Sequence, residues 1–511
     1  MDFSMPLNIT EVLLVLFPLV LAFIFYLRCE HRRKSLPPGP RGVPFLGNVF
    51  DIPQDQPWVV FSKISKEYGD VISVSILSQT TIILNSASAV NDLFDRRSSV
   101  YSTRPEATVT ISKITGWIWS MVVMPYGDDW RRNRRLLWQN FQPKTVGQWH
   151  SSQAQGTRRF LEALLEDSSD LNRTVRLSFC KTLMNITYGI PAQDVDYGFV
   201  NLLDEADTEI CEAYDHAVLI LPWVRRIPSW CPGGRWQRKL AGWQQLAKRT
   251  LEAPFERAQH AFNRGNASPS ITSNLLDAVD ADADLVKAVT AVILVSGVDT
   301  TSGTFLAFVC AMISHPEVQK RGQEELETVV GSSRLPQLDD RPSLPYVHAI
   351  VKELLRWHNV APLGVPHGCT QGDEYRGWRM PTNATIRINI WGILHDPELY
   401  PNPDAFIPER FLKDGKMNQD VFDPASIAFG AGRRVCPGRH FAENSLFINI
   451  ASMLHVFDIV PAVDAQGFPI PVEHRVTTGL LSTVKPFQYS IRIRSSSAKS
   501  LVRESIMDGD R

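Results

Sequence analysis

The sequence predicts a mainly α-helical protein with a small β portion, built around one long continuous block of chain. Helix signals outnumber strand signals throughout that block. We find no internal repeat, and no long linker before the Ser-rich, charged residues that follow about Arg494. With 44% hydrophobic and 21% charged residues among 511, the chain has the composition of a globular protein with a sizeable core.

The charge and the cysteines narrow the class of protein. The formal net charge is -1, so there is no basic excess for a phosphate backbone and we expect no nucleic-acid partner. The seven cysteines are scattered, with no CxxC pair and no dense framework. A sparse, odd-numbered set fits a reducing compartment, in which one thiol can have a special role.

The first predicted element is an apolar run at residues 12–27, followed at once by a basic cluster that ends at Lys34. Cleavable signal peptides place positive charge before the run. The order found here orients the amino terminus to the lumen and leaves the rest of the chain in the cytosol. The run is shorter than the roughly 20 residues of a comfortable span and contains Pro18. A cleaved signal and a surface-lying helix are therefore alternatives to the single-pass signal anchor that we predict in residues 1–34.

A proline-rich stretch follows the basic cluster. Prolines fix the backbone angle and remove hydrogen-bond donors, so this stretch cannot join a helix and is typical of a stiff spacer. We therefore divide the chain into an anchor with its basic stop (1–34), a hinge (35–44), one large body (45–494) and a polar tail (495–511).

Three helices and one strand can be placed within the body. Residues 284–313 are mostly apolar with a polar cluster near the middle, which favours a buried helix over a second membrane span. A second helix opens at Pro316 and closes at Gly331. A third runs from about residue 345 to 359. Residues 385–390 alternate in the manner of a strand.

The strongest chemical signal is a glycine-rich loop at residues 429–438, FGAGRRVCPG, which leads into a helix that begins near Arg439. Glycines permit tight turns and close approach of the backbone to a flat ligand. A cysteine at the start of a helix has its thiolate favoured by the helix dipole and nearby amides. The loop alone is equally consistent with a buried structural cysteine.

The spacing F-x-x-G-x-R-x-C-x-G in this loop closely resembles the haem-binding signature of the cytochrome P-450 superfamily. Four further motifs resemble those of the family and occur in the family's order: W-x-x-x-R at Trp130 and Arg134, the oxygen-activation motif at 296–301, E-x-x-R at 353–356 and P-E-R-F at 408–411. The resemblance covers essentially the whole chain, and the residues after Cys436 are most similar to fungal, membrane-bound members of secondary metabolism. It implies one large haem domain behind the anchor, at the endoplasmic reticulum membrane with the catalytic domain in the cytosol.

The resemblance implies haem b with Cys436 as the axial metal ligand, whose thiolate favours O–O cleavage. Haem carries two propionates in an apolar slot, and buried charge needs partners. Trp130, Arg134, His367 and Arg434 are the candidates by resemblance. The alternatives are a surface cation for Arg134 and a packed loop histidine for His367.

Two further groups have different implied roles. Glu353 and Arg356 lie on one helix face, and in the family such a pair meets an arginine, here Arg410, in a buried structural network. Asp299 and Thr300 are the candidate catalytic residues, because splitting dioxygen needs two protons delivered in order in a dry pocket. The alternative for Thr300 is a hydroxyl bonded back to the preceding helical turn.

Apolar stretches at 114–124, 361–365 and 479–481 match pocket-lining regions of the family, although each is equally consistent with plain core. Together with the anchor they favour a lipophilic small-molecule substrate, such as a terpenoid, polyketide or indole derivative. No flavin module is evident, so we expect electrons from NADPH through a membrane-bound cytochrome reductase flavoprotein. The expected activity is a monooxygenase. A haem-thiolate isomerase or dehydratase acting on a peroxide, and a non-catalytic haem sensor, are the alternatives.

Overall fold

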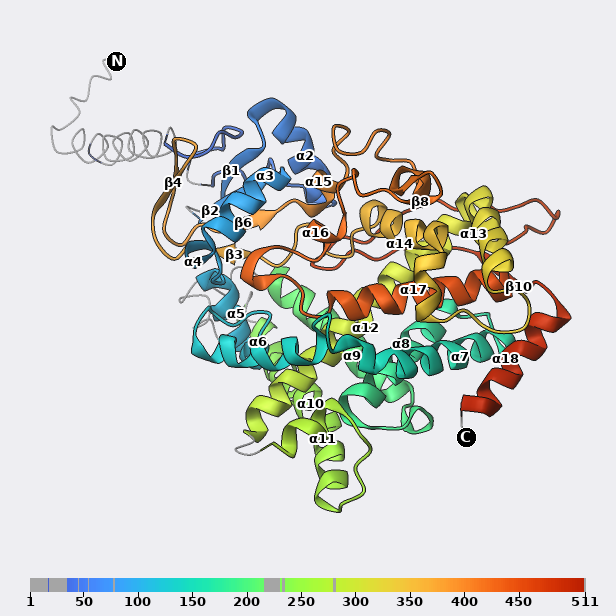
Figure 1. The fold of residues 1–511 in the computed structure, drawn as a ribbon. Helices are drawn as coiled ribbons and strands as arrows, with labels where there is room; N and C mark the ends of the chain where they lie inside the picture. Colours follow the sequence, from blue (N-terminus) through green and yellow to red (C-terminus); the bar gives the residue numbers. More distant parts are fainter. Residues whose placement is uncertain are drawn as a thin grey trace, which may run out of the picture.

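The computed structural model describes residues 17, 35–44, 46–53, 55–76, 79–215, 230–231, 235–278 and 282–509. Within these ranges helices dominate and strands are few and short, so the predicted fold class is confirmed. Figure 1 shows the helices filling one side of the molecule and the strands β1, β2, β3 and β6 gathered at the other.

The longer helices are α2 (Pro57–Tyr68), α5 (Glu106–Thr115), α6 (Asp128–Phe141), α7 (His150–Glu166), α8 (Leu171–Tyr188), α9 (Tyr197–Asp215), α10 (Arg235–Asn263), α12 (Ala283–Ser314), α13 (Pro316–Val329), α14 (Pro345–Trp357), α17 (Arg439–Val456) and α18 (Ser496–Gly509). The short helices are α3 (Ala87–Val90), η1 (Asn91–Arg96), α4 (Ser98–Tyr101), η2 (Trp117–Trp119), η3 (Val146–Trp149), η4 (Ala192–Asp194), α11 (Ile271–Leu276), η7 (Leu338–Ser343), α15 (Ile390–Leu394), η8 (Pro408–Phe411), α16 (Ala425–Ala428) and η9 (Gly432–Arg434).

The largest sheet has the strand order β1-β2-β6-β3, from β1 (Val71–Ile76), β2 (Gln79–Leu84), β6 (Thr385–Ile388) and β3 (His367–Gly368). Strand β2 pairs with β6 in parallel and with β1 antiparallel. The remaining strands form three antiparallel pairs: β4 (Asp373–Tyr375) with β5 (Trp378–Met380), β7 (Leu412–Lys413) with β8 (Lys416–Met417), and β9 (Phe457–Pro461) with β10 (Tyr489–Ile493). The sheet brings the residue-367 segment beside the first part of the body.

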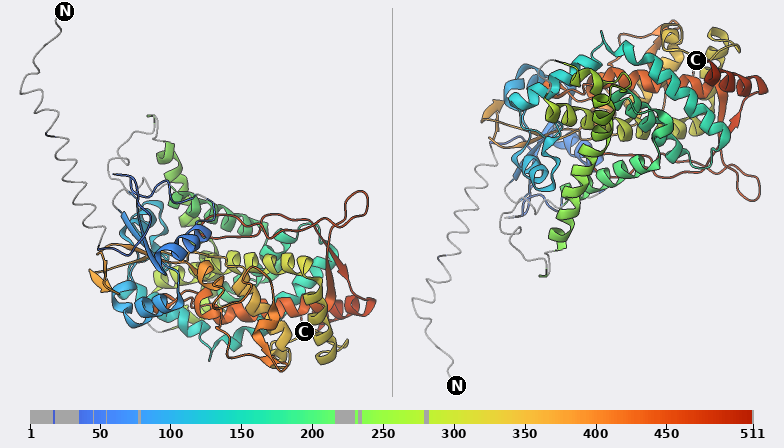
Figure 2. Two further views of the ribbon diagram at one scale, coloured as in Figure 1. Left: turned by 90° about the horizontal axis from the view of Figure 1, so that it is seen from above. Right: turned by 90° about the horizontal axis from the view of Figure 1, so that it is seen from below.

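Helix α12 runs through the middle of the helical side, as both views in Figure 2 show. Its first turn is capped by the Asp282 carboxylate, which accepts from the backbone N–H of Leu285 at 3.1 Å. Among the described residues it is the one helix long and apolar enough to cross a membrane, but 72% of its most apolar stretch is buried inside the protein. The prediction of a buried core helix over residues 284–313 is thus confirmed.

The other two predicted helices are also found, with small shifts at their ends. Helix α13 has proline in its first turn, and the backbone N–H of Gly331 closes it with a hydrogen bond to the Leu326 carbonyl at 3.3 Å. Helix α14 ends at Trp357. The predicted strand at 385–390 ends at Ile388 instead, because the side chain of Asn389 accepts from the Gly392 N–H and caps α15.

A buried ion-pair network lies between α14 and η8. The Arg356 guanidinium donates to both oxygens of Glu353, at 2.7 and 2.9 Å, and Arg410 donates to the same carboxylate at 3.1 Å. The side chains of Glu353 and Arg356 are fully buried. Because each charge is paired and hydrogen-bonded, the cost of burying it is offset. The predicted Glu353–Arg356–Arg410 network is therefore confirmed.

The hinge residues lie against the sheet. Ser73 in β1 donates its backbone N–H to the Pro38 carbonyl at 2.9 Å and its hydroxyl to the Pro37 carbonyl at 2.6 Å. A Cβ on Gly39 would lie 2.1 Å from the Ser73 carbonyl oxygen, so only glycine permits this approach. The predicted anchor in residues 1–34 lies outside the described residues, apart from Phe17.

Candidate functional site

The cysteine loop is shaped by its glycines. Gly430 and Gly432 have φ of 76° and 63°, a region that side chains disfavour. A Cβ on Gly432 would lie 2.2 Å from the Phe94 carbonyl oxygen. The backbone N–H of Cys436 donates to the Phe429 carbonyl at 2.8 Å and closes the loop. The loop is therefore a specific turn that presents Cys436 just before α17.

Opposing influences act on the thiol of Cys436. Burial raises its pKa, whereas the Gly438 amide and the nearby guanidinium groups of Arg134 and Arg439 lower it. Amide donors and cations are the surroundings that stabilise a thiolate ligand. No group of three or more His, Cys, Asp or Glu among the described residues is placed to hold a metal ion. A metal at Cys436 would therefore need most of its ligands from a cofactor.

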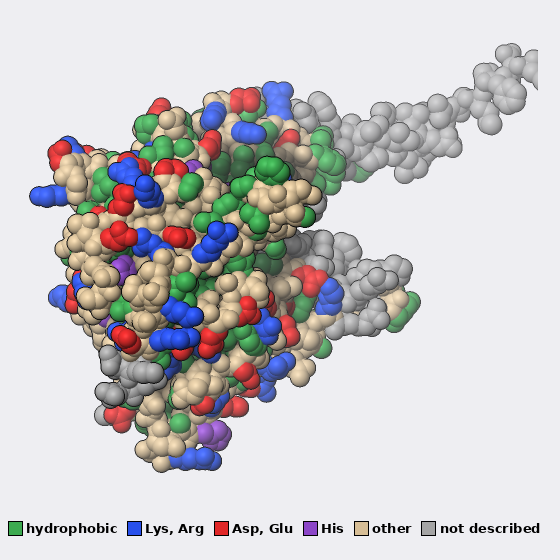
Figure 3. Space-filling model, turned by 90° about the vertical axis from the view of Figure 1, so that its right-hand side faces the viewer, with side chains coloured by type: hydrophobic (Ala, Val, Ile, Leu, Met, Phe, Trp, Pro, Cys, Tyr) green, Lys and Arg blue, Asp and Glu red, His purple; other side chains and the backbone are tan. Residues whose placement is uncertain are grey.

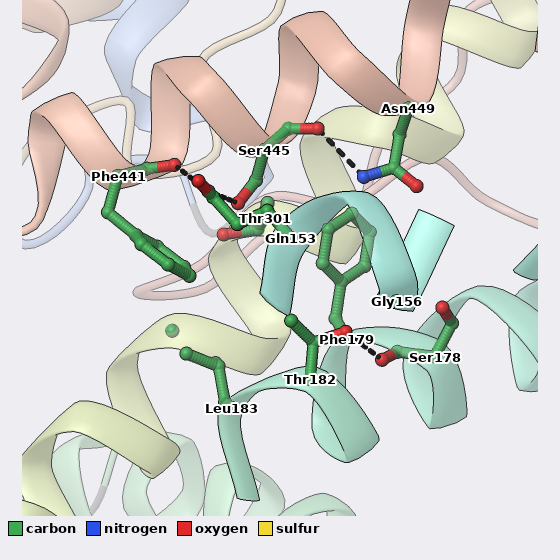
Figure 4. Close-up of a pocket in the computed structure, with 11 residues that line it drawn as sticks. Gln153, Gly156, Ser178, Phe179, Thr182, Leu183, Thr301, Phe441, Ser445 and Asn449 are labelled. Atoms are coloured by element: carbon green, nitrogen blue, oxygen red, sulfur yellow. Dashed lines mark hydrogen bonds between the residues drawn. The ribbon is translucent and has the colours of Figure 1, made fainter. Parts of the chain in front are cut away.

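The start of α17 is fixed against the middle of α12. Gln153 of α7 donates its amide to the Phe441 carbonyl at 3.0 Å and to the Ser445 hydroxyl at 2.6 Å. These residues line a small cavity of about 10 Å³ with Gly297 and Thr301 of α12 (Figure 4). Phe441 lies in the first turn of α17, directly after the cysteine loop, so this loop leads into a helix that packs beside the centre of α12.

Helix α12 carries a polar, accessible stretch beside Gly297 and Thr301. Ser296 is exposed and Thr300 is partly exposed, although the helix around them is buried. The Thr300 hydroxyl donates to the Ser296 carbonyl at 2.7 Å, which is the back-bonded geometry of a plain helix threonine. Its lone pairs still point outward and can accept a proton donor.

Asp299 is buried, with 5% of its surface exposed. The guanidinium of Arg176 on α8 bonds to its carboxylate at 2.5 Å and also pairs with Asp204 on α9, whose side chain is 48% exposed. Burial raises the pKa of Asp299 to about 7, Arg176 opposes this rise, and Asp207 and Asp204 add to it. The chain Asp299–Arg176–Asp204 connects the buried carboxyl to the solvent.

Arg434 of the cysteine loop is partly buried and well positioned. It donates to the carbonyls of Ser102 at 2.8 Å, Met121 at 3.2 Å and Met124 at 2.8 Å. Burial, together with the cations Arg104 and Arg134, lowers its pKa to about 8. A guanidinium has five N–H donors, so two stay available after these three bonds. Such a group strongly favours an anion beside it.

Arg134 and Trp130, both on α6, have unused donors. Burial lowers the pKa of Arg134. Within the described chain the guanidinium of Arg134 forms no hydrogen bond and no ion pair. The indole N–H of Trp130 is buried without an acceptor, and the guanidinium of Arg434 lies 4.5 Å from its ring centroid. Buried donors are almost always satisfied. The three side chains therefore fit a ligand that brings carboxylates, as a haem with two propionates would.

His367 could bind a carboxylate of the same ligand only in its protonated form. Its Nδ1 lies 2.9 Å from the Tyr101 carbonyl oxygen and its ring packs on Phe94 with centroids 4.3 Å apart. Burial and the nearby Arg104 and Arg434 cations lower its pKa well below the usual range. In this neutral form Nδ1 donates to Tyr101, so Nε2 can only accept. His367 would hold a carboxylate only after gaining a proton.

Sequence patterns did not indicate two residues of this region. Arg104 is buried, donates to the carbonyls of Val122 at 2.6 Å and Pro366 at 2.7 Å, and holds the residue-366 turn beside the cysteine loop. Arg176 has no local motif, because its partners lie on two other helices. The prolines flanking Arg104 and His367 were the one available signal that these turns are fixed.

Comparison with known proteins adds a family. The cytochrome P450 family model matches residues 37–491. The chain is 36% identical to cytochrome P450 monooxygenase COX2 of Coprinopsis cinerea, over 93% of this chain and 92% of that protein. It is 34% identical to COX1 of the same fungus, over 97% and 99% of the two chains. It is 36% identical to the tryptamine 4-monooxygenase of Psilocybe cyanescens, over 93% and 97%.

Proposed function

The chain belongs to the cytochrome P450 superfamily, as an oxygen-dependent monooxygenase of the fungal type, and from this premise we propose that it oxidises a lipophilic small molecule of fungal secondary metabolism. The substrate class is a terpenoid, polyketide or indole derivative. One relative is named for tryptamine, which supports the indole-derived option. The observation that carries the proposal is the glycine-shaped loop that presents Cys436, found together with the accessible Ser296–Thr300 stretch in the otherwise buried helix α12.

In the proposed site Cys436 ligates the iron of haem b. Arg134, Arg434 and the indole N–H of Trp130 hold the propionates, and His367 joins them when protonated. The unpaired Arg134 guanidinium and the unsatisfied Trp130 donor support this assignment. When bound, haem supplies oxygen activation, assisted by electron density from the thiolate.

The residues of α12 handle protons. Asp299 is proposed to take a proton from solvent through the exposed Asp204, and Arg176 holds the two carboxylates in line. A carboxyl whose pKa is about 7 exchanges protons readily at neutral pH. Thr300 is proposed to position the proton donor at the reacting oxygen. This retained Asp–Thr pair does not favour the isomerase or sensor alternatives.

Electrons are proposed to arrive from NADPH through a membrane-bound cytochrome reductase flavoprotein. Arg131, Arg132 and Arg135 of α6 are exposed, and so is Arg433 of the cysteine loop. Arg433 and Arg131 both lie over the Tyr126 ring, at 5.2 and 5.5 Å from its centroid. This links the basic edge of α6 to the cysteine loop and supports docking of an acidic partner beside Cys436.

The proposed location is the endoplasmic reticulum membrane, with the anchor in residues 1–34 and the catalytic domain in the cytosol. Exposed apolar side chains gather near the hinge: Val43, Leu46, Val49, Phe50 and Ile76, of which Phe50 is 78% exposed. Backbone bridges join Val43 to Gly47 and Gly47 to Ile76, so these side chains share one place on the surface. In Figure 3 hydrophobic side chains gather toward the upper right of the view. Such a patch supports contact with lipid.

The test is turnover of the haem-loaded protein with a reductase, NADPH and a candidate substrate. A monooxygenase requires all three and oxygen, whereas an isomerase would convert a peroxide without NADPH and a sensor would turn nothing over. The matched spectroscopic control is Cys436→Ser. We expect the reduced carbon monoxide complex to lose its thiolate-type Soret band, and survival of that band would show that Cys436 is not the ligand.

A further inference from the structure

Glu209 on α9 is a buried acid that the proposed proton route does not use. Only 3% of its surface is exposed. The Trp117 indole N–H donates to its Oε1 at 3.3 Å, while its Oε2 is buried without a partner. Burial raises the pKa of Glu209 to about 8, and the nearby Glu212 carboxylate adds to the rise. No cation pairs with Glu209 among the described residues, so the carboxyl keeps its proton at neutral pH.

Two other acids of α9 are neutralised by cations from neighbouring helices. Glu212, one turn further along α9, pairs with Lys239 of α10. Asp204, one turn before, pairs with Arg176. Glu209 has neither a cation nor a second donor among the described residues. A buried carboxyl without compensation costs stability, which is typical of a group whose partner is a ligand.

The surroundings of Glu209 are aromatic and apolar. Trp117 packs with Ala206 and Ala247, and Trp119, Ile210 and Val295 pack against them. The Trp117 and Trp119 rings lie 5.2 Å apart between centroids, and the Trp119 indole N–H is also buried without an acceptor. Aromatic faces attract cations as well as apolar groups. The aromatic groups beside this carboxyl are those that would contact an apolar molecule with one positive charge.

This cluster borders the accessible side of α12. Val295 precedes the exposed Ser296. A Cβ on Gly479 would lie 3.9 Å from the Cys211 sulfur of α9, and a Cβ on Gly303 would lie 3.0 Å from Thr483 Cγ2. The 479–483 loop therefore contacts both α9, which carries Glu209, and α12, which carries Ser296 and Thr300.

We propose that Glu209 is a substrate-recognition residue whose carboxylate binds the protonated amine of a lipophilic arylalkylamine, with Trp117 and Trp119 against its apolar part. The inference rests on the proposed function and narrows its substrate class. The ammonium would supply the missing partner of Oε2. Binding leaves the carboxyl ionised, so an ammonium that binds at pH 7 releases the proton that Glu209 holds in the free enzyme.

The experiment measures dissociation constants by titration calorimetry of the haem-loaded enzyme. The probes are tertiary arylalkylamines of increasing size, beginning with N,N-dimethyl-2-phenylethylamine, each compared with the neutral hydrocarbon of the same shape. We expect the native enzyme to prefer at least one amine over its isostere by about 10- to 100-fold. Proton release is read from the same titrations in buffers of different ionisation enthalpy.

Glu209→Gln is the test variant, because its amide oxygen can still accept from Trp117 and its shape is unchanged. It should lose the amine preference and the proton release, bind the neutral isosteres as before, and raise KM for amines more than it changes kcat. Glu212→Gln, which removes an acid on the same helix that pairs with Lys239, should keep the amine preference of the native enzyme. A melting temperature at or above the native value would show that Glu209→Gln is folded.

Two results would overturn the inference. One is that no amine binds better than its isostere; the other is an amine preference that persists in Glu209→Gln. If either occurs while the thiolate band and NADPH-dependent oxidation are intact, the inference fails and the proposed function stands. Absence of the thiolate band in the native protein would instead contradict the proposed function.

Discussion

At the scale of single residues, Thr300 tests the proton chemistry. Thr300→Ala removes the hydroxyl but neither a charge nor a core contact, so electrons and oxygen should still be consumed. Loss of one positioned proton-transfer group costs about 10²–10⁴-fold in the step it serves. Product should therefore fall far more than NADPH consumption, with hydrogen peroxide released instead. NADPH, peroxide and product are measured together.

Thr304→Ala is the matched control for Thr300→Ala. Thr304 donates to the Thr300 carbonyl at 2.8 Å, the same back bond one turn further along α12. Its removal should leave the ratio of peroxide to product unchanged. If the ratio of peroxide to product is the same in Thr300→Ala and Thr304→Ala, Thr300 is only a helix residue.

The raised pKa of Asp299 predicts how product formation depends on pH. Its pKa is raised to about 7, so the carboxyl is protonated below that pH and ionised above it. If the protonated form supplies the proton, product formation in the native enzyme falls as pH rises through about 7. Asp299→Asn should form product slowly at every pH, and its rate should not fall as the pH rises through about 7. If the rate of Asp299→Asn still falls as the pH rises through about 7, the titrating group is not Asp299.

Some of these residues could be predicted from the sequence, and others could not. Glu353, Arg356 and Arg410 were predictable because their motifs are short and local. Arg176 on α8 pairs with acids on α9 and α12, and Glu209 is buried on α9 with one carboxyl oxygen unpartnered. Neither the three-helix pairing of Arg176 nor the burial of Glu209 with an unpartnered oxygen has a pattern along the chain, since both arise from packing between helices.

At the scale of elements, the cysteine loop depends on Gly432. An alanine there would adopt an unfavourable left-handed conformation, which costs about 1–2 kcal/mol, and its Cβ would also meet the Phe94 carbonyl oxygen. Gly432→Ala should lower both the melting temperature and the haem content. Gly415→Ala is the control, because Gly415 has a similar φ of 71° but nothing within 4 Å of an added Cβ. Equal haem loss in both variants would contradict the role of the close approach.

Helices could be predicted from the sequence where a long apolar run or a clear end signal exists. The ends of strands could not be predicted. The apolar run of α12 and the proline and glycine limits of α13 placed them to within two residues. Asn389 instead ends its strand because its amide bonds to the Trp58 carbonyl at 2.9 Å and to Asn85 at 2.8 Å. Helix α18 is polar overall, yet it buries Val502 completely. Both outcomes depend on tertiary contacts.

At the scale of the whole molecule, removal of residues 1–34 tests the anchor. Every haem motif lies far downstream, so the thiolate-type spectrum should be kept while the protein is released from the membrane by high salt or carbonate. Part of it should still bind lipid vesicles through the apolar patch near the hinge, and Phe50→Asp in the truncated protein should weaken that binding. Loss of haem on truncation would show that the segment does more than anchor.

The two hydrogen bonds from Ser73 to the hinge carbonyls have a consequence for encounter kinetics. With the anchor and its basic stop proposed for residues 1–34, only Ser35 and Leu36 lie between this segment and the hydrogen-bonded prolines, so the tether to the sheet is short. Enzyme and reductase would then meet by lateral diffusion in two dimensions, with little rotational freedom. Electron transfer would depend on the surface density of the two proteins in the membrane, and only weakly on their concentration per volume of cell.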